Sequence, residues 1–268
     1  MKIINDEIKL HHQLQQWQYQ GNTTALVPIM EPLHRGHLTL IAKAKQHATR
    51  VIVCMCYPKT LAESYLPNSL QDQNKFLFGS LADLIYKPEI TLSHYQDIPF
   101  VSDILNFFGQ PSSFKSIATI TCKMLSQMCP TVVCLSEKDF QQMMVIRHMI
   151  ANLTMPIHII SMPTEREPDG LAVSAYNHLL PHELRPHANQ LKNTIDWMGQ
   201  KLMQGNSIKR VITQGKLQLR TWGFQPDYID ILDPNNLKPA DEKTDELGIF
   251  ASAFLGRPRL NDHLIIQR

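Results

Sequence analysis

Two histidines lie three residues apart in the stretch "VPIMEPLHRGHLTLIAKAK" (residues 27–45). The stretch begins as an apolar run and continues with helical spacing, so His34 and His37 fall at the start of a predicted helix and share one side of it. The free backbone N–H groups of a first helical turn favour phosphate oxygens, and Gly36 lets the backbone approach a ligand closely. We therefore expect the two imidazoles to donate hydrogen bonds to the phosphates of a nucleotide. The alternative is that one histidine caps the helix and the other is exposed.

A second polar group, "CLSEKDFQQ" (residues 134–142), also falls where a strand passes into a helix. Lys138 is a compact cation suited to a phosphate whose charge grows during transfer. Asp139 could hydrogen-bond a ribose or cap the helix, and Gln142 could orient a small polar substrate. The structural alternative is an ordinary capped helix start.

A third group lies in the polar loop "PTEREPDGLAVSAYN" (residues 163–177). The run from Pro168 to Gly170 predicts a turn, and Ser174 and Asn177 offer side-chain donors to a ligand. A long polar loop after a buried strand is often a lid, although an interdomain linker would have the same composition.

The elements that position these groups alternate along the chain between strands and helices. Apolar runs predict strands at 24–30, 50–58, 131–135 and 157–163, and helical spacing predicts helices at 37–48, 70–86, 116–128 and 140–153. Strands with few polar residues suit a parallel sheet that is buried on both faces. The expected fold is an α/β, Rossmann-like, doubly wound parallel sheet, in which ligands gather beyond the carboxyl ends of the strands.

The pattern changes from about His178. Residues 180–205 are predicted to be helical, and 227–239 and 248–266 resemble strands joined by Pro/Asn turns. We predict a larger domain over 1–177 and a smaller C-terminal α+β domain over 178–268.

Composition narrows the classes of partner. Lys and Arg number 26 against 24 Asp and Glu in 268 residues, without a long basic run, so the charge footprint of a nucleic-acid binder is missing. No stretch approaches the roughly 18–20 apolar residues that span a bilayer. We expect small-molecule partners, no membrane and a cytoplasmic location. Five cysteines without paired C-x-x-C spacing are expected to be reduced and buried rather than to bind zinc: Cys54, Cys56, Cys122, Cys129 and Cys134.

Several of these stretches are similar to known motifs. "VPIMEPLHRGH" is similar to PTMGxLHxGH, "LSEKDFQQMMVIRHMI" to the GEKDxQQ helix, and "DGLAVSAYN" to DGLAxSSRN, and the C-terminal "YIDILDPNNLKP" and "FLGRPRLNDHLI" follow in order. Taken together, nearly the whole chain resembles the pantothenate synthetase (pantoate–β-alanine ligase) family of the H-x-G-H nucleotidyltransferase superfamily.

The resemblance implies a reaction in two steps with ATP and Mg²⁺. Pantoate's carboxylate attacks the α-phosphate and releases pyrophosphate, and β-alanine's amine then attacks the acyl-adenylate to give pantothenate and AMP. By this resemblance His34 and His37 stabilise the phosphates and Lys138 the migrating charge. The implied ATP-binding residues are Pro28, Met30, Gly36, Ser136, Asp139, Thr164 and Ser174. The implied substrate positions are Gln142, Thr60 and Tyr57. Asp72 could assist Mg²⁺ or simply be solvated, the second domain would act as a lid, and the family's habit is a homodimer.

Departures from the family pattern leave the reaction open. Glu31 stands at the family's glycine and brings a carboxylate near a polyanion, unless it turns away or helps a metal. Tyr57 and Thr60 replace an Asn and a Gln, "QPSSF" from Gln110 replaces R-P-G-H-F, and Ala175 and Tyr176 replace Ser-Arg. Three hypotheses remain: an active pantothenate synthetase, an adenylate-forming ligase for another carboxylic acid or amine, and a non-catalytic nucleotide-binding paralogue. Lys59 or Arg35 could compensate for the lost arginine.

Overall fold

The computed structural model describes residues 2–56, 81–88 and 113–268, with only the backbone described at 113–117. The chain splits into two compact units. Unit 1 comprises Met1–Glu137 and Gln142–Pro163, and unit 2 comprises Lys138–Gln141 and Thr164–Arg268. That residues 1–177 and 178–268 form separate domains stays a prediction.

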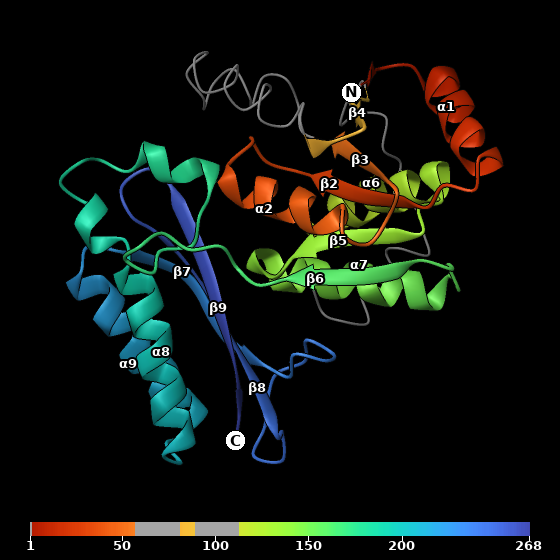
Figure 1. Ribbon diagram of the computed structural model, residues 1–268. Helices are drawn as coiled ribbons and strands as arrows, with labels where there is room; N and C mark the ends of the chain where they lie inside the picture. Colours follow the sequence, from red (N-terminus) through yellow and green to blue (C-terminus); the bar gives the residue numbers. More distant parts are fainter. Residues whose placement is uncertain (1, 57–80, 89–112) are drawn as a thin grey trace. The chain divides into compact units, whose positions relative to one another are not determined.

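Unit 1 is built on a sheet whose described strands are all parallel (Figure 1). In order across the sheet they are β1 (Lys2–Ile4), β4 (Leu84–Tyr86), β3 (Arg50–Met55), β2 (Thr24–Ile29), β5 (Val132–Ser136) and β6 (His158–Met162). The central strands are apolar and β-branched because they are covered on both faces, as the burial of 51–54 and 132–135 shows.

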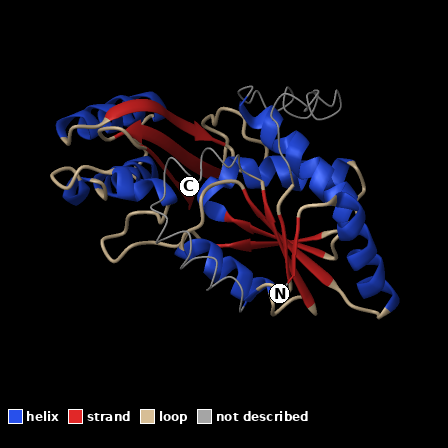
Figure 2. Cartoon of the chain, turned by 90° about the horizontal axis from the view of Figure 1, so that it is seen from above, coloured by secondary structure: helices blue, strands red, loops and turns tan. Residues whose placement is uncertain are grey.

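Helices lie on both faces of this sheet (Figure 2). The described helices are α1 (Glu7–Tyr19), α2 (Arg35–Ala44), α6 (Ser113–Met128) and α7 (Phe140–Asn152). In α2 the apolar positions recur at helical spacing, so Leu40, Ile41 and Ala44 are buried and pack over β2, β3 and β5.

The chain reverses its direction across the sheet between β2 and β5. From β2 it proceeds through β3 to β4 on one side, whereas β5 returns to pair with the other side of β2, with Leu26 opposite Val133. Such a switch point leaves a crevice beyond the carboxyl ends of the two strands, where doubly wound sheets bind their ligands. The turn after β2, which carries His34 and His37, lies at this point.

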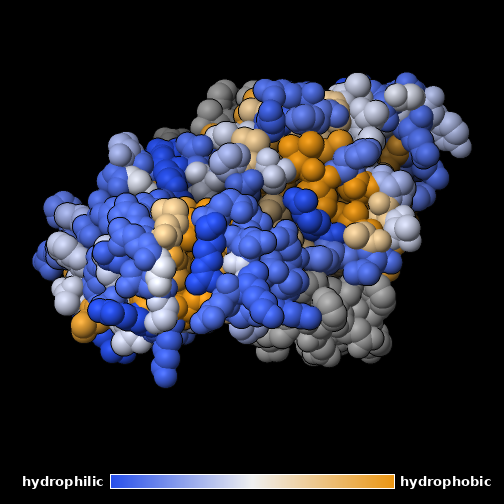
Figure 3. All heavy atoms as spheres, turned by 90° about the horizontal axis from the view of Figure 1, so that it is seen from below, coloured by the Kyte–Doolittle hydropathy of each residue, from blue (hydrophilic) through white to orange (hydrophobic). Residues whose placement is uncertain are grey.

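The strand β6 forms one edge of the sheet and is less buried than its neighbours. Four of its five residues are half-buried and His158 is exposed. Figure 3 shows hydrophobic side chains gathered on the face of this part of the molecule that is seen from below.

Unit 2 combines an antiparallel sheet with two helices. The strands β7 (Gln225–Leu232), β8 (Glu246–Phe254) and β9 (Arg259–Gln267) pair in that order. The central strand β8 is buried along almost its whole length, and α8 (Gln190–Met203) and α9 (Ile208–Thr221) pack on the sheet. The tight turn from β8 to β9 places Gly256 at φ +66°, a region that a residue without a Cβ enters at little cost.

Three expectations need correction. The predicted helix over 70–86 is wrong at its end, because Leu84–Tyr86 forms the strand β4 and fills the space between β1 and β3. The predicted helix over 180–205 begins as the α-helix α8 only at Gln190, after a 3₁₀ turn that contains Pro186. Cys129 is exposed rather than buried, since it follows the last turn of α6 with φ +41°.

Among the described residues, none of the helices has the length and apolar composition to cross a bilayer.

Candidate active site

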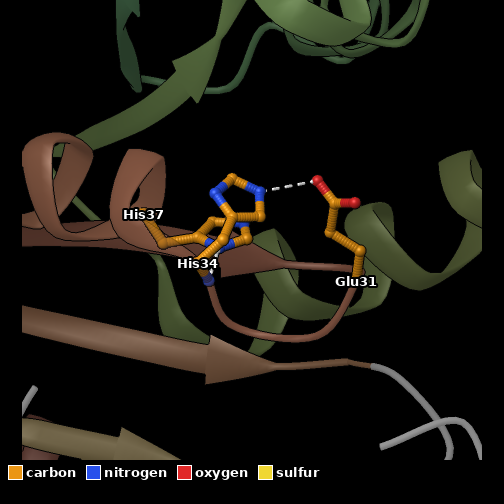
Figure 4. A group of neighbouring side chains, drawn as sticks. All are labelled: Glu31, His34 and His37. Atoms are coloured by element: carbon orange, nitrogen blue, oxygen red, sulfur yellow. Dashed lines mark hydrogen bonds and ion pairs between the residues drawn. The ribbon is translucent and has the colours of Figure 1, made fainter. Parts of the chain in front are cut away.

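The turn from β2 into α2 carries the histidine pair. His34 is the N-cap of α2 in extended conformation, and His37 lies one turn further along. The two rings face each other with centroids 3.9 Å apart (Figure 4). The expectation that both side chains lie on one side of the helix start is therefore confirmed, and neither histidine is simply exposed.

The hydrogen bonds of His37 fix which of its ring nitrogens carries a proton. The backbone N–H of His34 donates to His37 Nδ1 over 3.2 Å, so Nδ1 must present its lone pair. A neutral imidazole that accepts at Nδ1 carries its proton on Nε2. His37 is 8 % exposed, and its Nε2–H is therefore a positioned donor that needs no protonation of the ring to bind an anion. The capping half of the alternative is correct, because this ring accepts from the N-cap N–H, but its other half is wrong, because the second histidine is not exposed.

Glu31 accepts the hydrogen bond that the other histidine, His34, donates. His34 Nε2 lies 2.9 Å from Glu31 Oε1, and the two side chains are 12 % and 15 % exposed (Figure 4). Because a carboxylate only accepts, the proton of His34 lies on Nε2. His34 Nδ1 is buried and has no hydrogen-bond partner among the described residues. The carboxylate at this position thus turns toward the histidine pair rather than away from it.

The remaining predicted residues of unit 1 lie at the carboxyl ends of β2 and β5. Pro28 pairs with Cys54 inside the sheet, and Met30 follows the end of β2. Gly36 lies in the first turn of α2, and Ser136 is the last residue of β5. Gln142 lies in the first turn of α7 and is half-buried.

In unit 2, Lys138 and Asp139 form a charged pair in the 3₁₀ turn Glu137–Asp139. Lys138 Nζ lies 3.2 Å from Asp139 Oδ2, and the lysine side chain is only 9 % exposed. Asn261 Nδ2 donates to the other oxygen of Asp139 over 3.0 Å. The Asp139 carboxylate is thereby fixed between a cation and an amide, and the ammonium of Lys138 is held where few waters reach it.

The loop over 163–177 is tied to β9. The Arg166 guanidinium donates to both carboxylate oxygens of Asp262, over 2.7 and 2.9 Å, and to the carbonyl of Gly170. Hydrogen bonding to Asp262 raises the pKa of Arg166 above its ordinary value. The predicted turn at 168–170 is confirmed, since Gly170 N–H donates to the Glu167 carbonyl and Gly170 has φ +91°.

Within this loop the two predicted ATP-binding residues have different surroundings. The Thr164 hydroxyl is buried and has no hydrogen-bond partner among the described residues. Ser174 caps the 3₁₀ helix Ala175–Leu179 by accepting from Tyr176 N–H over 3.3 Å. Ala175 is buried and Tyr176 is half-buried. Asn177, whose side chain we expected to face a ligand, donates to the Ala172 carbonyl.

Several predicted positions lie outside the described residues: Tyr57, Lys59, Thr60, Asp72 and Gln110.

Two contacts of this region did not follow from motif reading. Asn261 reaches Asp139 and Asp262 reaches Arg166 across about a hundred residues of sequence, and no spacing rule connects them. The only available signal was polarity, because Asn261 and Asp262 interrupt an apolar strand pattern in β9.

A parallel, doubly wound sheet with a donor histidine pair at its switch point defines a Rossmann-like α/β protein of the nucleotidyltransferase type. Comparison with known proteins gives the family. The model of the pantoate-beta-alanine ligase family matches residues 2–265. The chain is 35% identical to the pantothenate synthetase of Shewanella sediminis, with 99% of this chain and 100% of that protein covered, and 32% identical to that of Aliivibrio salmonicida, with 100% and 94% covered. The chain belongs to the pantoate–β-alanine ligase family.

Solved structures agree with this fold. The pantothenate synthetase of Thermus thermophilus is 26% identical with a TM-score of 0.79, and the alignment covers 98% of this chain and 99% of that chain. The pantoate-beta-alanine ligase of Francisella tularensis, solved with beta-gamma ATP and beta-alanine, has a TM-score of 0.70 at 23% identity over 99% and 97% of the two chains, which shows the fold alone. The predicted family, fold class and ligase class are confirmed, and the individual site residues stay predictions.

Proposed function

We propose that this protein ligates pantoate to β-alanine at the expense of ATP, through a pantoyl-adenylate. Family membership supports the reaction, and ATP and β-alanine are the ligands named for the Francisella tularensis relative. The observation that carries the proposal for this chain is the orientation of the His37 ring, because its Nδ1 accepts from the His34 N–H and its proton therefore lies on Nε2.

The first step requires charge stabilisation more than a protein nucleophile. A pantoate carboxylate oxygen bonds to the α-phosphorus of ATP as the bond from that phosphorus to the bridging oxygen breaks, and pyrophosphate leaves with the electron pair. His37 Nε2–H and, once Glu31 releases it, His34 Nε2–H would donate to the phosphate oxygens. Lys138, whose low exposure strengthens its field, would balance the negative charge that moves toward pyrophosphate.

The second step regenerates the free site. The amine nitrogen of β-alanine attacks the acyl carbon of the adenylate, the acyl–oxygen bond breaks, and AMP leaves while the amine loses a proton. The protein's part here is positional. We propose that Gln142 orients pantoate and that Asp139 contacts the ribose. The loop over 163–177 would close together with the second domain. The remaining residues proposed to line the nucleotide are Pro28, Met30, Gly36, Ser136, Thr164 and Ser174.

Mg²⁺ would enter with ATP. It prefers oxygen ligands and commonly binds through substrate phosphates and one or two carboxylates, and Glu31 is a carboxylate beside the histidine pair. We propose that phosphate oxygens supply most of the ligands of this Mg²⁺ ion.

A homodimer through the N-terminal part and a cytoplasmic location are further proposals. Light scattering would test the first and cell fractionation the second.

The test is ATP–pyrophosphate exchange with purified protein, Mg²⁺ and pantoate. The informative variant is His37→Asn, because the Asn oxygen can still accept from the His34 N–H while the distal donor is lost. Removing one such donor costs about 10²–10³ in rate, so exchange should fall at least about a hundredfold with little change in melting temperature. Lys138→Gln should also lose exchange, whereas His182→Asn, an exposed histidine, should behave as the wild type.

Three outcomes would count against the proposal. Wild-type exchange in His37→Asn would show that Nε2 does not bind the reacting phosphates. Exchange that requires a different acid would favour a ligase with another substrate. The observation that favours this alternative is that a buried Ala175 and a half-buried Tyr176 stand in place of the family's Ser-Arg. ATP binding without exchange for any acid would favour a non-catalytic paralogue.

A further inference from the structure

The β2–α2 turn gathers three metal-ligating side chains. Glu31, His34 and His37 each offer one ligand atom, and these atoms all lie within 4.8 Å of one another. The three residues recur at every third position of one short turn that starts from a buried strand and ends in a helix. Figure 4 shows the two rings and the carboxylate drawn toward one another. This group therefore has a defined position before any ligand arrives.

The donor set selects the class of cation. Two imidazole nitrogens and one carboxylate oxygen suit zinc and its first-row neighbours, whereas Mg²⁺ and Ca²⁺ prefer oxygen donors alone. Ligands on a tetrahedral zinc ion lie about 3.4 Å apart, given bond lengths near 2.0–2.2 Å. His34 Nε2 and Glu31 Oε1, now 2.9 Å apart, would separate slightly to admit an ion, and the ligand atom of His37 already lies within 4.8 Å of both.

Charge and hydrogen bonding favour such an ion. Glu31 supplies the negative charge that a dication needs, and the neutral His34 ring would present Nε2 to the ion after its proton moves to Nδ1. His34 Nδ1 is buried without a hydrogen-bond partner among the described residues, so the ion would break no hydrogen bond at that nitrogen. An ion at His37 Nδ1 would replace the 3.2 Å hydrogen bond that this nitrogen accepts from the His34 N–H.

We propose that Glu31, His34 and His37 form a binding site for a first-row transition-metal dication of the zinc class, and that the bound ion blocks the phosphate site. The second part rests on the proposed function, because the ion uses the same histidines that would contact ATP. The glycine expected at position 31 from the family resemblance would supply no third ligand, so this site would be a property of this chain.

The binding test uses Co²⁺ alone, without nucleotide or substrate. We expect one Co²⁺ per chain with the intense visible absorption of a four-coordinate ion, and Glu31→Gln should weaken the binding at least about tenfold, since even outer-shell changes cost 10–100-fold in affinity. His34→Asn should weaken it similarly. The matched control is the double variant His11→Ala/His12→Ala, which removes a pair of exposed adjacent histidines that could bind metal adventitiously.

The outcomes distinguish this metal site from the other residues that could bind Co²⁺. Unchanged affinity in Glu31→Gln, or loss of binding in the His11/His12 variant instead, would overturn the proposal. A thiolate-to-cobalt charge-transfer band would also overturn it, because it would assign the ion to Cys54 and Cys56, whose sulfurs lie 3.1 Å apart. Circular dichroism of each variant excludes misfolding as the reason for lost binding.

The regulatory part is tested by pantothenate formation at free Zn²⁺ levels that a metal buffer sets. Activity should fall as free Zn²⁺ rises, and Glu31→Gln should need at least about tenfold more Zn²⁺ for half-inhibition. Equal sensitivity of the two proteins would overturn the inhibitory role. If the protein forms no pantothenate at all, the proposed function fails while the Co²⁺ titration still decides the metal site.

Discussion

At the scale of single residues, the candidate site is defined by which ring nitrogens of His34 and His37 carry a proton and which present a lone pair. His37 uses one nitrogen to cap α2 and keeps the other as a donor, and His34 gives its Nε2–H to Glu31. If ATP binds here as we propose, its phosphates need the His34 donor that Glu31 already holds. Under that proposal the carboxylate competes with the nucleotide for the same hydrogen bond.

Replacement of Glu31 by glycine should relieve this competition. A hydrogen bond to a charged group contributes about 1.5–3 kcal/mol, and part of that would be given up if ATP binds as we propose. We expect the KM for ATP of Glu31→Gly to fall about tenfold, which corresponds to about 1.4 kcal/mol, with a smaller change in kcat. Steady-state kinetics with Glu183→Gln, an exposed glutamate, as control would check this. A higher KM would mean that Glu31 helps to hold the nucleotide, for example through its metal.

The sequence predicted the identity of these residues but not their hydrogen bonds. The spacing of His34 and His37 predicts that they share one side of a helix start, because helical periodicity fixes that direction. The direction of the Glu31 side chain depends on the turn after β2, and a loop residue has several allowed rotamers that sequence cannot rank. The expectation that a carboxylate either turns away or helps a metal omitted the contact that forms.

At the scale of elements, one ion pair joins the loop over 163–177 to β9. Asp262 is 3 % exposed and accepts from Arg166 twice and from the His263 backbone N–H once. Its partner Arg166 is 26 % exposed, so water screens the pair only in part. The bidentate geometry adds direction as well as energy, and it holds the start of this loop against the last strand of unit 2.

Loss of the Asp262 charge should therefore destabilise unit 2. Breaking a fully buried pair costs about 3–5 kcal/mol, and the partial exposure of Arg166 reduces this to roughly 2 kcal/mol. The denaturant midpoint of Asp262→Asn should shift accordingly, while Asp227→Asn, at the exposed pair with Arg259, should change the free energy of unfolding by less than about 1 kcal/mol. Equal shifts for both variants would show that burial does not set the contribution of Asp262.

Elements were predictable where their pattern was long. The strands β2, β3, β5 and β6 and the helices α6 and α7 lie close to their predicted ranges because apolar runs and helical spacing persist over several residues. The strand Leu84–Tyr86 is three residues long and continues an amphipathic run, so its strand character comes from its neighbours β1 and β3 rather than from its own pattern. The helix Ile208–Thr221 did not appear among the predicted elements, although its apolar positions also recur at helical spacing.

At the scale of the whole molecule, the five thiols report on packing across unit 1. Cys54, Cys56, Cys122 and Cys134 are buried and Cys129 is exposed. Burial raises the pKa of the Cys134 thiol to about 11 and raises that of Cys54 well above its ordinary value, since a thiolate is costly in apolar surroundings. Only the thiolate reacts quickly with disulfide reagents.

One thiol per native chain should therefore react rapidly, and Cys129→Ser should remove that fast phase. Cys134, whose pKa burial raises to about 11, should contribute nothing to the fast phase at pH 7 to 9. Cys122→Ser is the control and should leave the fast phase unchanged. Two or more fast thiols in the folded protein would contradict the packing described for β3 and β5.

The N-cap of α2 has a consequence for engineering this enzyme. Histidine is a poor N-cap in comparison with serine, aspartate or asparagine, and this helix accepts it together with a second ring that supplies the missing acceptor. A substitution chosen only to improve the cap at position 34 would gain thermostability and give up the donor that we propose for the phosphates. Thermostabilising libraries that include this turn should therefore enrich for inactive proteins, which makes position 34 one to hold fixed.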